Sequence, residues 1–441
     1  MNETKNISEI VKIKLCNTCG ACAGVCPVNA IHYEESIGGY YFPIVAESLC
    51  TQCGLCCRVC PGWYFGKTLM KKMPDKPFEG VALASYVGKA TDKQLFDNSQ
   101  SGGVVSAILV SALETGIIRG AVTVYMQMGN PPRPRIRIAQ NKDDVFLAQK
   151  SKYCPVPLLK IIKELEDYDG KIAIVGTSCQ IHGLYNVLDK KKKIREKIAF
   201  CIGLFCEKVL TYAAIDYFLY KAKMENGVNT GIIFKDKLLT GYPGDVHLFT
   251  DYMSTFISSR RRIQIKPYFT PARCRICFDK MNVFSDISVG DPHGLKNIDK
   301  RNGESAIIIR TKTGEDVLDQ VLKNKAISIR SADYQNILDG QLISNKKQEW
   351  RGYTEAWSLS GRNLPSFSEY LKKWTKYPVK ANRFNKDLAQ SFALDNYTSG
   401  YELIRQVDSS IKKNKIKKIL FKPYILVEKL KKKLLGLFAI K

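Results

Sequence analysis

Two runs of cysteine near the start of the chain limit its fold more than any other feature. Each run reads C-x2-C-x2-C-x3-C-P, and the cysteines are Cys16, Cys19, Cys22 and Cys26 in the first run and Cys50, Cys53, Cys56 and Cys60 in the second. This spacing is typical of bacterial ferredoxins that hold two iron–sulfur clusters of the [4Fe–4S] type. The motif therefore indicates a cofactor, an electron-transfer chemistry and a reducing compartment.

The spacing also predicts which cysteines share a cluster, because the fourth cysteine of each run binds the cluster of the other run. We predict two ligand sets: Cys16, Cys19, Cys22 and Cys60 for cluster 1, and Cys50, Cys53, Cys56 and Cys26 for cluster 2. A disulfide framework and zinc are the alternatives. No secretory signal precedes the cysteines, which argues against disulfides, and the spacing is too crowded for separate tetrahedral zinc sites.

The chain has 441 residues, which is too long for a ferredoxin alone. Beyond the cysteine runs there is room for one large domain or two. No apolar run approaches the roughly 18 residues that cross a membrane. We therefore expect a cytoplasmic protein, either soluble or bound peripherally to the inner face of the membrane.

The net charge of +26 is unevenly distributed along the chain. Residues 1–75 carry seven Lys and Arg against six Asp and Glu, whereas residues 411–441 carry eleven Lys and one Glu. Such a field favours an acidic redox carrier, a phosphorylated or otherwise acidic coenzyme, or an anionic membrane surface. The basic stretches at 190–193 and 260–262 lack interleaved aromatic residues, so nucleic acid is not an expected partner.

Three regions are predicted along the chain. Residues 1–75 should form an α+β ferredoxin-like domain, and residues 66–78 resemble a linker because they are rich in Lys, Gly and Pro. Residues 76–345 alternate strand-like segments, such as 171–176, with helical patterns, which favours a larger α/β domain around a buried sheet. Residues 346–441 are expected to be a helical extension that ends in a basic tail.

The tail from Ser410 to Lys441 has an amphipathic helical pattern. Its apolar stripe and basic face consist of Val427, Leu430, Leu434 and Leu437 on one side and Lys429, Lys432 and Lys433 on the other. Such a helix can lie on an anionic membrane. Docking of the same helix on the body of the protein is the alternative.

Six more cysteines lie beyond the ferredoxin motif: Cys154, Cys179, Cys201, Cys206, Cys274 and Cys277. Cys274 and Cys277 form a C-x2-C pair, which alone fits zinc, a redox pair or a further cluster. Cys179 and Cys206 each follow a predicted buried strand, and ligands tend to bind at the carboxyl ends of such strands. We expect these four cysteines to converge.

The helix predicted over residues 102–115 begins with a glycine-rich segment. This segment consists of Ser101, the expected N-cap, followed by Gly102 and Gly103. Glycines at a helix N-terminus allow backbone amides to approach a phosphate. A plain helix start is the alternative.

The motifs follow one another in the order of a known family. After the two cysteine runs come SGGVVSAIL (101–109), SKY (151–153), VGTSCQI (175–181), GLFC (203–206), CRIC (274–277) and DISVGD (286–291). Over about residues 10–345 the chain resembles the beta subunits of coenzyme F-420 hydrogenases and dehydrogenases. The resemblance implies FAD and iron–sulfur clusters that exchange electrons with a two-electron carrier, often coenzyme F-420. A related branch reduces a chlorophyll side chain, and other bacterial members lie near surface-polysaccharide genes.

The resemblance also implies roles for individual residues. A third [4Fe–4S] cluster is implied at Cys179, Cys206, Cys274 and Cys277. A flavin site is implied at Ser101, Gly102, Gly103, Lys152, Gly176, Thr177 and Ser178. The chain departs from the family at Ser178, where many relatives have Pro, at Cys154, where an aliphatic residue is usual, and beyond residue 345, which leaves the electron acceptor open.

The sequence thus predicts an iron–sulfur flavoprotein oxidoreductase. Electrons should run between a low-potential donor, such as a ferredoxin or another oxidoreductase subunit, the clusters, FAD and a two-electron carrier such as coenzyme F-420. Four His and no recognisable nucleophile triad suit side chains that position and tune cofactors. One alternative is a non-catalytic relay subunit that feeds a partner reductase linked to surface-polysaccharide synthesis. Another is a membrane-surface scaffold.

Overall fold

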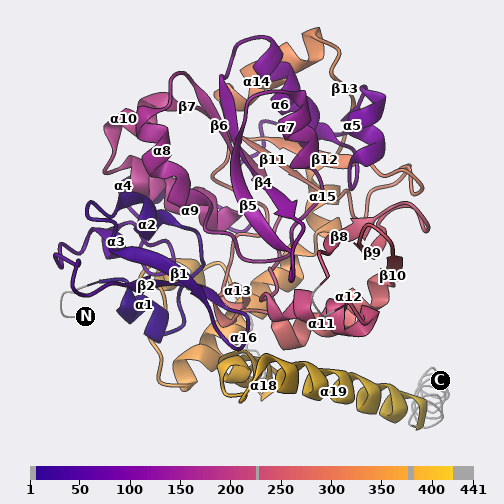
Figure 1. Ribbon diagram of the computed structural model, residues 1–441. Helices are drawn as coiled ribbons and strands as arrows, with labels where there is room; N and C mark the ends of the chain where they lie inside the picture. Colours follow the sequence, from indigo (N-terminus) through magenta and orange to yellow (C-terminus); the bar gives the residue numbers. More distant parts are fainter. Residues whose placement is uncertain (1–5, 225–227, 376–381, 421–441) are drawn as a thin grey trace, which may run out of the picture.

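The computed structural model describes residues 6–224, 228–375 and 382–420 (Figure 1). The ferredoxin unit consists of α1 (Ser8–Lys12), α2 (Ala21–Val25), α3 (Leu55–Arg58) and the antiparallel strands β1 (Ile31–Glu35) and β2 (Tyr41–Val45). Gly20 and Gly54 precede α2 and α3 with φ angles of 94° and 67°, a left-handed conformation that favours glycine. The backbone therefore turns sharply between the second and third cysteine of each run.

An eight-stranded mixed sheet forms the large domain, in the order β13-β3-β12-β11-β7-β6-β4-β5. Its parallel centre consists of β11 (Ile287–Gly290), β7 (Ile198–Leu204), β6 (Ile172–Gly176) and β4 (Gly120–Gln127). Antiparallel pairing adds β12 (Ser305–Ile309), β3 (Ala84–Ala90), β13 (Ile327–Ser331) and β5 (Arg133–Ala139). Every residue of β12 is buried, as expected for a strand covered on both faces.

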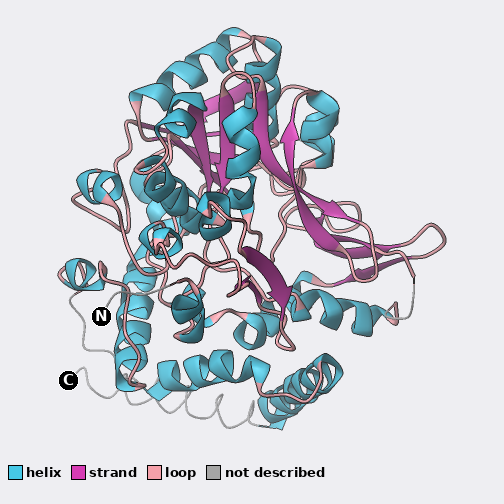
Figure 2. Cartoon of the chain, turned by 60° about the vertical axis from the view of Figure 1, so that its left-hand side comes forward, coloured by secondary structure: helices cyan, strands magenta, loops and turns pink. Residues whose placement is uncertain are grey.

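Helices cover both faces of this sheet, with a hydrophobic core on each (Figure 2). One face carries α5 (Lys93–Asn98), α6 (Val104–Glu114), α7 (Lys142–Leu147) and α14 (Lys312–Lys323). The other carries η1 (Leu158–Ile161), α8 (Ile162–Asp167), α9 (Ser178–Leu188) and α10 (Lys192–Lys197). This three-layer arrangement confirms the mixed α/β architecture predicted for the large domain.

The ferredoxin unit packs on the α9 face and shares its core. Cys19 and Val59 lie in the same hydrophobic core as Leu159 of η1. A Cβ on Gly24 of α2 would lie 2.1 Å from the Leu159 carbonyl oxygen, and one on Gly183 of α9 would lie 3.2 Å from Cys19 Sγ. The backbones approach closely at Gly24, and at Gly183 the Leu159 and Cys19 side chains leave little room, so a larger residue at either point would require a shift.

The segment 66–78 is packed against the large domain, so the prediction of a linker is wrong. It contains α4 (Lys67–Lys71), and both Leu69 and Phe78 are buried. The Gly66 amide donates to Asn186 Oδ1 of α9 at 2.8 Å. Two apolar anchors thus outweigh a composition that otherwise favours a loop.

A second sheet of three antiparallel strands lies at the right of Figure 1, in the order β10-β9-β8. Its strands are β8 (Gly231–Asp236), β9 (Asp245–Phe249) and β10 (Ser254–Ile257). It shares a hydrophobic core with α11 (Ala213–Ala222) and α12 (Ser259–Phe269). Only β8 was expected, because β9 and β10 are short and lack a regular alternation of apolar residues.

The carboxyl-terminal region is helical and runs beneath the ferredoxin unit and the small sheet in Figure 1. Its elements are α16 (Ile343–Leu359), α17 (Ser368–Lys372), α18 (Asn382–Phe392), η2 (Ala393–Asp395) and α19 (Gly400–Leu420). Two short helices, α13 (Ala272–Arg275) and α15 (Tyr334–Gly340), precede this region in the chain. Asp395 accepts from Ser36 Oγ at 2.5 Å and from the Gly38 amide at 3.1 Å, so this region holds the turn between β1 and β2.

The predicted amphipathic stripe of Val427, Leu430, Leu434 and Leu437 lies outside the described residues. Within the described ranges, no helix combines the length and the apolar character needed to cross a membrane.

Candidate functional site

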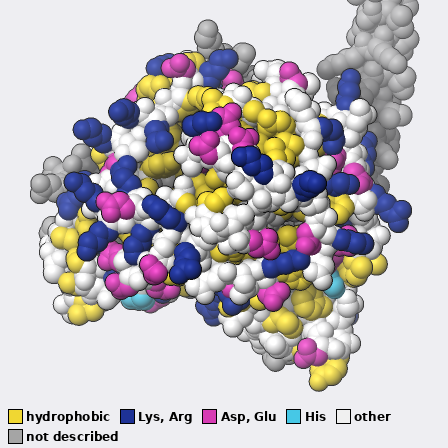
Figure 3. Space-filling model, turned by 90° about the horizontal axis from the view of Figure 1, so that it is seen from above, with side chains coloured by type: hydrophobic (Ala, Val, Ile, Leu, Met, Phe, Trp, Pro, Cys, Tyr) yellow, Lys and Arg dark blue, Asp and Glu magenta, His cyan; other side chains and the backbone are white. Residues whose placement is uncertain are grey.

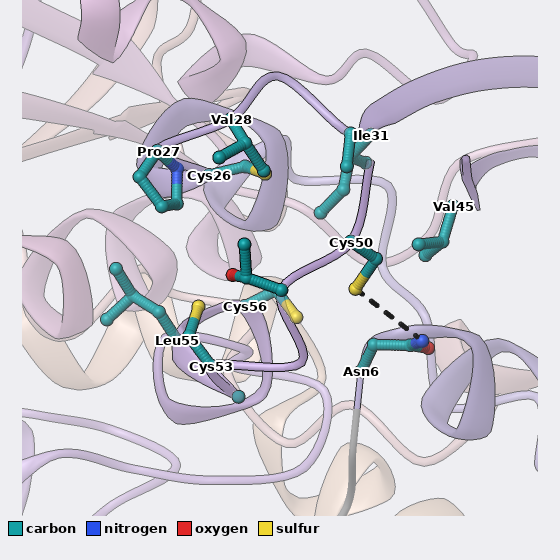
Figure 4. Close-up of a pocket in the computed structure, with 13 residues that line it drawn as sticks. Asn6, Cys26, Pro27, Val28, Ile31, Val45, Cys50, Cys53, Leu55 and Cys56 are labelled. Atoms are coloured by element: carbon teal, nitrogen blue, oxygen red, sulfur yellow. Dashed lines mark hydrogen bonds between the residues drawn. The ribbon is translucent and has the colours of Figure 1, made fainter. Parts of the chain in front are cut away.

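Cysteines from both runs line one pocket of the ferredoxin unit (Figure 4). They are Cys26 of the first run and Cys50, Cys53 and Cys56 of the second. Apolar side chains complete the lining, among them Val28, Ile31, Val45 and Leu55. Cys53 is exposed, whereas Cys26 and Cys56 are buried. The structure thus brings together the four residues predicted for cluster 2, although their role as ligands stays a prediction.

Of the cysteines predicted for cluster 1, Cys19, Cys22 and Cys60 are buried and Cys16 is half-buried. Burial, and to a smaller extent neighbouring thiolates, raise the pKa of the Cys16, Cys22 and Cys60 thiols to about 12. Burial raises the pKa of Cys19 as well, and Cys60 and Cys22 raise it further. Thiolates at such positions need compensating positive charge, and iron binds the thiolate form. The group therefore fits the ligands of an iron–sulfur core.

The second set of cysteines also converges, as expected from the strand ends. Cys179 lies in the first turn of α9, directly after β6, and Cys206 follows β7. Cys274 lies in α13, and Cys277 follows it. Burial raises the pKa of the Cys206 thiol, and the charges of Cys179, Cys274 and Cys277 raise it further.

The three cysteine groups adjoin one another. Cys179 contributes to the raised pKa of Cys16 and Cys19, so the third group adjoins the cluster 1 group. On the other side, Cys56 of the cluster 2 pocket contributes to the raised pKa of Cys22. The cluster 1 group therefore lies between the other two.

These groups differ in geometry from a site for one metal ion. Across the described part of the chain, no three histidine, cysteine or carboxylate side chains are placed to hold a single ion. A [4Fe–4S] core instead presents four separate irons to four thiolates.

A buried arginine lies among the cluster 1 and third groups. Arg273 of α13 is 5% exposed, and its Nε and Nη1 have no hydrogen-bond partner among the described residues. Burial raises the pKa of the Cys60, Cys179 and Cys274 thiols, and the charge of Arg273 opposes that rise at all three. A buried, unpaired guanidinium is unfavourable unless an anion compensates it. Thiolate-bound clusters on both sides of Arg273 would supply that negative charge.

The first two segments predicted for the flavin meet near the end of β11. The Gly102 amide donates to Ser305 Oγ at 3.1 Å, and the Ser151 amide donates to Gln100 Oε1 at 3.2 Å. Gln100 also forms a hydrogen bond with the Asp291 carboxylate. The predicted capping is wrong: α6 begins at Val104 and Gly103, with φ of 72°, is its N-cap, because the tight turn needs a left-handed residue.

The third segment lies beside Cys179. Gly176 ends β6, and Thr177 caps α9 through a reciprocal pair of hydrogen bonds with Gln180. Ser178 is buried, and its Oγ has no hydrogen-bond partner among the described residues. Gln180 Nε2 donates to the Val156 carbonyl at 2.9 Å, so residues 151–156 connect this turn with the first two segments.

Lys152 belongs to the second of these segments and is half-buried. Its ammonium donates to the carbonyl oxygens of Ala148 and Gln149 at 2.6 and 2.7 Å. Burial lowers the pKa of Lys152 to about 7, although Cys154 opposes the shift. A lysine with such a pKa can both take up and release a proton near neutrality.

A group of interacting cations, here called the cationic cluster, adjoins the third cysteine group. Its members are Lys208, Lys235, Arg262, Lys266, Lys280 and Lys346, with Glu207, Asp291 and His293 among them. Burial lowers the pKa of Lys266 and Lys280, and Glu207 opposes the shift. Lys346 also acts on Cys206 and Cys274. Cations outnumber carboxylates in this set, which favours a bound anion.

The cationic cluster was not anticipated, because its residues are spread between positions 207 and 346 and only the high net charge hinted at it. The outer surface differs from this interior site. In the view of Figure 3, Lys and Arg are interspersed with Asp and Glu and form no continuous basic patch among the described residues.

Known protein families match most of the chain. The amino-terminal and carboxyl-terminal families of the coenzyme F-420 hydrogenase/dehydrogenase beta subunit match residues 85–163 and 169–335. A 4Fe-4S dicluster domain matches residues 15–62. The ferredoxin unit is therefore an iron–sulfur domain, as its spacing predicts.

Individual relatives agree with these matches. An uncharacterised protein of Methanocaldococcus jannaschii is 30% identical over 74% of this chain and 92% of its own length. The coenzyme F-420 hydrogenase subunit beta of Methanosarcina barkeri is 24% identical over 56% of this chain and 80% of its own. A solved chain of the F-420-reducing [NiFe] hydrogenase complex from Methanosarcina barkeri shares the fold, with a TM-score of 0.50 over 64% of this chain and 95% of that chain at 20% identity.

Proposed function

This chain belongs to the coenzyme F-420 hydrogenase/dehydrogenase beta-subunit family, and we propose that it passes electrons between a low-potential donor and a two-electron carrier such as coenzyme F-420. The observation that carries the proposal is the series of three adjoining cysteine groups, of which the third adjoins the cationic cluster. Such a series would connect the surface near Cys53 with an interior site suited to an anion.

Twelve cysteines would hold three clusters in this proposal. Cluster 1 takes Cys16, Cys19, Cys22 and Cys60, cluster 2 takes Cys50, Cys53, Cys56 and Cys26, and the third takes Cys179, Cys206, Cys274 and Cys277. The unpaired donors of Arg273 support the assignment of cluster 1 and the third cluster. Negatively charged clusters at these positions would compensate the buried positive charge of Arg273.

The flavin proposal rests on the segments at the sheet edge. Ser101, Gly102, Gly103, Lys152, Gly176, Thr177 and Ser178 would hold FAD, and the cationic cluster would neutralise its phosphates. The free Ser178 Oγ offers a buried donor beside Cys179. A bound flavin supplies the exchange between one-electron and two-electron chemistry. Lys152, with its pKa near 7, would hold or release a proton beside it.

A second candidate function is that of an electron-relay subunit. Relatives of this chain carry the name of a hydrogenase subunit beta, which favours a partner oxidoreductase subunit. The exposed Cys53 at the cluster 2 pocket also offers a place where a redox partner could approach. In that case the carrier would be reduced only when the partner is present.

Anaerobic purification followed by iron and flavin analysis tests the proposal. We expect about 12 irons and one FAD per chain, from three four-iron clusters and one flavin site. Reduced ferredoxin, NADH and reduced coenzyme F-420 are then added in turn, and bleaching of the cluster and flavin absorbance identifies the donor. Eight irons without flavin would reject the flavoenzyme, and carrier reduction only with an added subunit would favour the relay.

A further inference from the structure

The small sheet brings together a serine, a histidine and a carboxylate. Ser254 Oγ lies 2.8 Å from His247 Nε2, and His247 Nδ1 lies 2.9 Å from Asp236 Oδ2. The three residues come from the neighbouring strands β10, β9 and β8. The sequence alone shows no recognisable nucleophile triad at these positions. Only pairing of the strands, two of which were not anticipated, brings these residues into contact.

Hydrogen bonding defines the tautomer of a neutral His247. The Asp236 carboxylate also accepts from the Leu238 amide at 2.9 Å, and Lys150 Nζ lies 4.0 Å away, so both favour its ionised form. An ionised carboxylate only accepts hydrogen bonds, and a neutral His247 must therefore carry its proton on Nδ1. Its Nε2 then has a lone pair directed at the Ser254 hydroxyl, which is the arrangement of a general base beside a serine nucleophile.

Aromatic contacts and strand pairing hold the imidazole in place. The ring stacks on Phe256 with a centroid distance of 4.2 Å and an interplanar angle of 11°, and Phe249 lies 5.1 Å away. The register pairs His247 with Phe256 on one side and Ile233 on the other. A base fixed on paired strands is better oriented than one on a loop.

The serine is accessible, whereas its partners are shielded. Ser254 is exposed, and the side chains of His247 and Asp236 are 13% and 12% exposed. The two residues before it, Tyr252 and Met253, are 93% and 57% exposed. An electrophile can therefore reach the hydroxyl from solvent along an apolar approach.

We propose that Ser254 is an activated nucleophile that is acylated by esters with an apolar acyl group. Ser254 Oγ forms a bond to the ester carbonyl carbon while its proton moves to His247 Nε2. The bond from that carbon to the alcohol oxygen breaks, and the alcohol leaves with this proton. Water, deprotonated by the same nitrogen, then releases the carboxylic acid and restores the serine.

Turnover should be slow, because the nearby turn amides are already engaged. Tyr252 and Met253 donate their amides to Thr250 Oγ1 at 3.1 and 2.9 Å, so they do not stabilise an oxyanion. Acylation by a reactive reagent is therefore a more sensitive readout than ester hydrolysis.

The test treats the full-length protein with a fluorophosphonate and locates the adduct by mass spectrometry. We expect labelling of Ser254, and a fall in its rate of about 100-fold in His247→Gln, since general-base catalysis is typically worth at least that factor. Ser258→Ala, which changes an exposed serine four residues along the chain, should leave the rate unchanged. Iron content and circular dichroism show whether each variant folds.

Two outcomes would overturn the proposal. One is no adduct at Ser254 under conditions in which the reagent labels trypsin completely. The other is labelling of His247→Gln at the wild-type rate, which would make the three residues a structural hydrogen-bond chain. Neither outcome depends on the flavin or on the third cluster, so the result is independent of the proposed electron transfer.

Discussion

The ferredoxin cysteines and the second cysteine group show two ways in which one chain can build a ligand set. In the ferredoxin unit, two short runs and two left-handed glycines bring eight cysteines together within residues 16–60. The second group instead collects Cys179, Cys206, Cys274 and Cys277 from two strand ends and α13, across 99 positions of the chain. The first set depends on local turns, whereas the second depends on the whole sheet.

Their surroundings differ as well. The cluster 2 pocket is lined mainly by apolar side chains, and one of its cysteines, Cys53, is exposed. The third group lies beside Arg273 and Lys346. Positive charge stabilises the reduced, more negative state of a cluster, so a bound third cluster should have the higher reduction potential. Four experiments test this contrast and the packing around it.

Replacing one cysteine of each set tests the ligand assignment and has the largest expected effect. Cys274→Ala should lower the iron content by about four per chain, because a four-iron cluster with three thiolates is labile. Cys60→Ala should remove a similar amount from cluster 1. Cys201→Ala, a buried thiol in β7, is the control and should retain all the iron. Unchanged iron in Cys274→Ala would reject the third cluster.

Removing the buried charge tests how the surroundings tune the clusters. Arg273→Gln should lower the reduction potentials of cluster 1 and the third cluster by about 60 mV, if the lost interaction is worth about 1.4 kcal/mol for a one-electron couple. Cluster 2 should be unaffected. Potentiometric titration followed by electron paramagnetic resonance measures each potential, and an equal shift at all three clusters would contradict the placement of Arg273.

Replacing Asp395 tests whether the carboxyl-terminal region supports the ferredoxin unit. Asp395→Ala removes the acceptor for Ser36 Oγ and the Gly38 amide, and it removes the ion pair with Lys14. We expect a loss of about 1–2 kcal/mol in the free energy of unfolding. Hydrogen exchange should become faster in residues 36–40 and stay unchanged in β11. Asp319→Ala, on the far helix α14, is a control.

The smallest expected effect is a change in how the free energy of unfolding depends on pH. Burial raises the pKa of Asp216 to about 6, although Arg133, which also binds Glu35 of β1, opposes the rise. The folded state therefore takes up this proton at a higher pH than the unfolded state, so this group favours folding below about pH 4 and loses that contribution as pH rises through 6. Asp216→Asn should remove this component, measured as a flatter dependence of unfolding free energy on pH between 4 and 7. An unchanged slope would exclude Asp216 as its source.

The same contrast explains what could be predicted from the sequence. The eight ferredoxin cysteines follow from spacing, and the buried strands β6, β7 and β12 follow from short apolar runs. Cys179 and Cys206 could be placed because strand ends are visible in the sequence. Arg273 and the cationic cluster could not, since a buried charge has no periodic signal and its neighbours lie in distant segments.

The sequence-based predictions of local structure were wrong where a few tertiary contacts outweighed the local composition. Residues 66–78 look like a loop, but Leu69 and Phe78 find apolar pockets. Gly103 replaces Ser101 as the cap because the turn needs a positive φ angle. His247 and Ser254 gave no signal, since β9 and β10 are too short for their alternation to be read.

The close packing of the ferredoxin unit on the large domain at Gly24 and Gly183 has a consequence for electron-transfer rates. A tethered ferredoxin samples many orientations, and its electron transfer waits for a productive collision. Here the two parts share a hydrophobic core, so we expect the gap between them to vary little with domain motion. The rate of electron transfer across this boundary should therefore be insensitive to solvent viscosity.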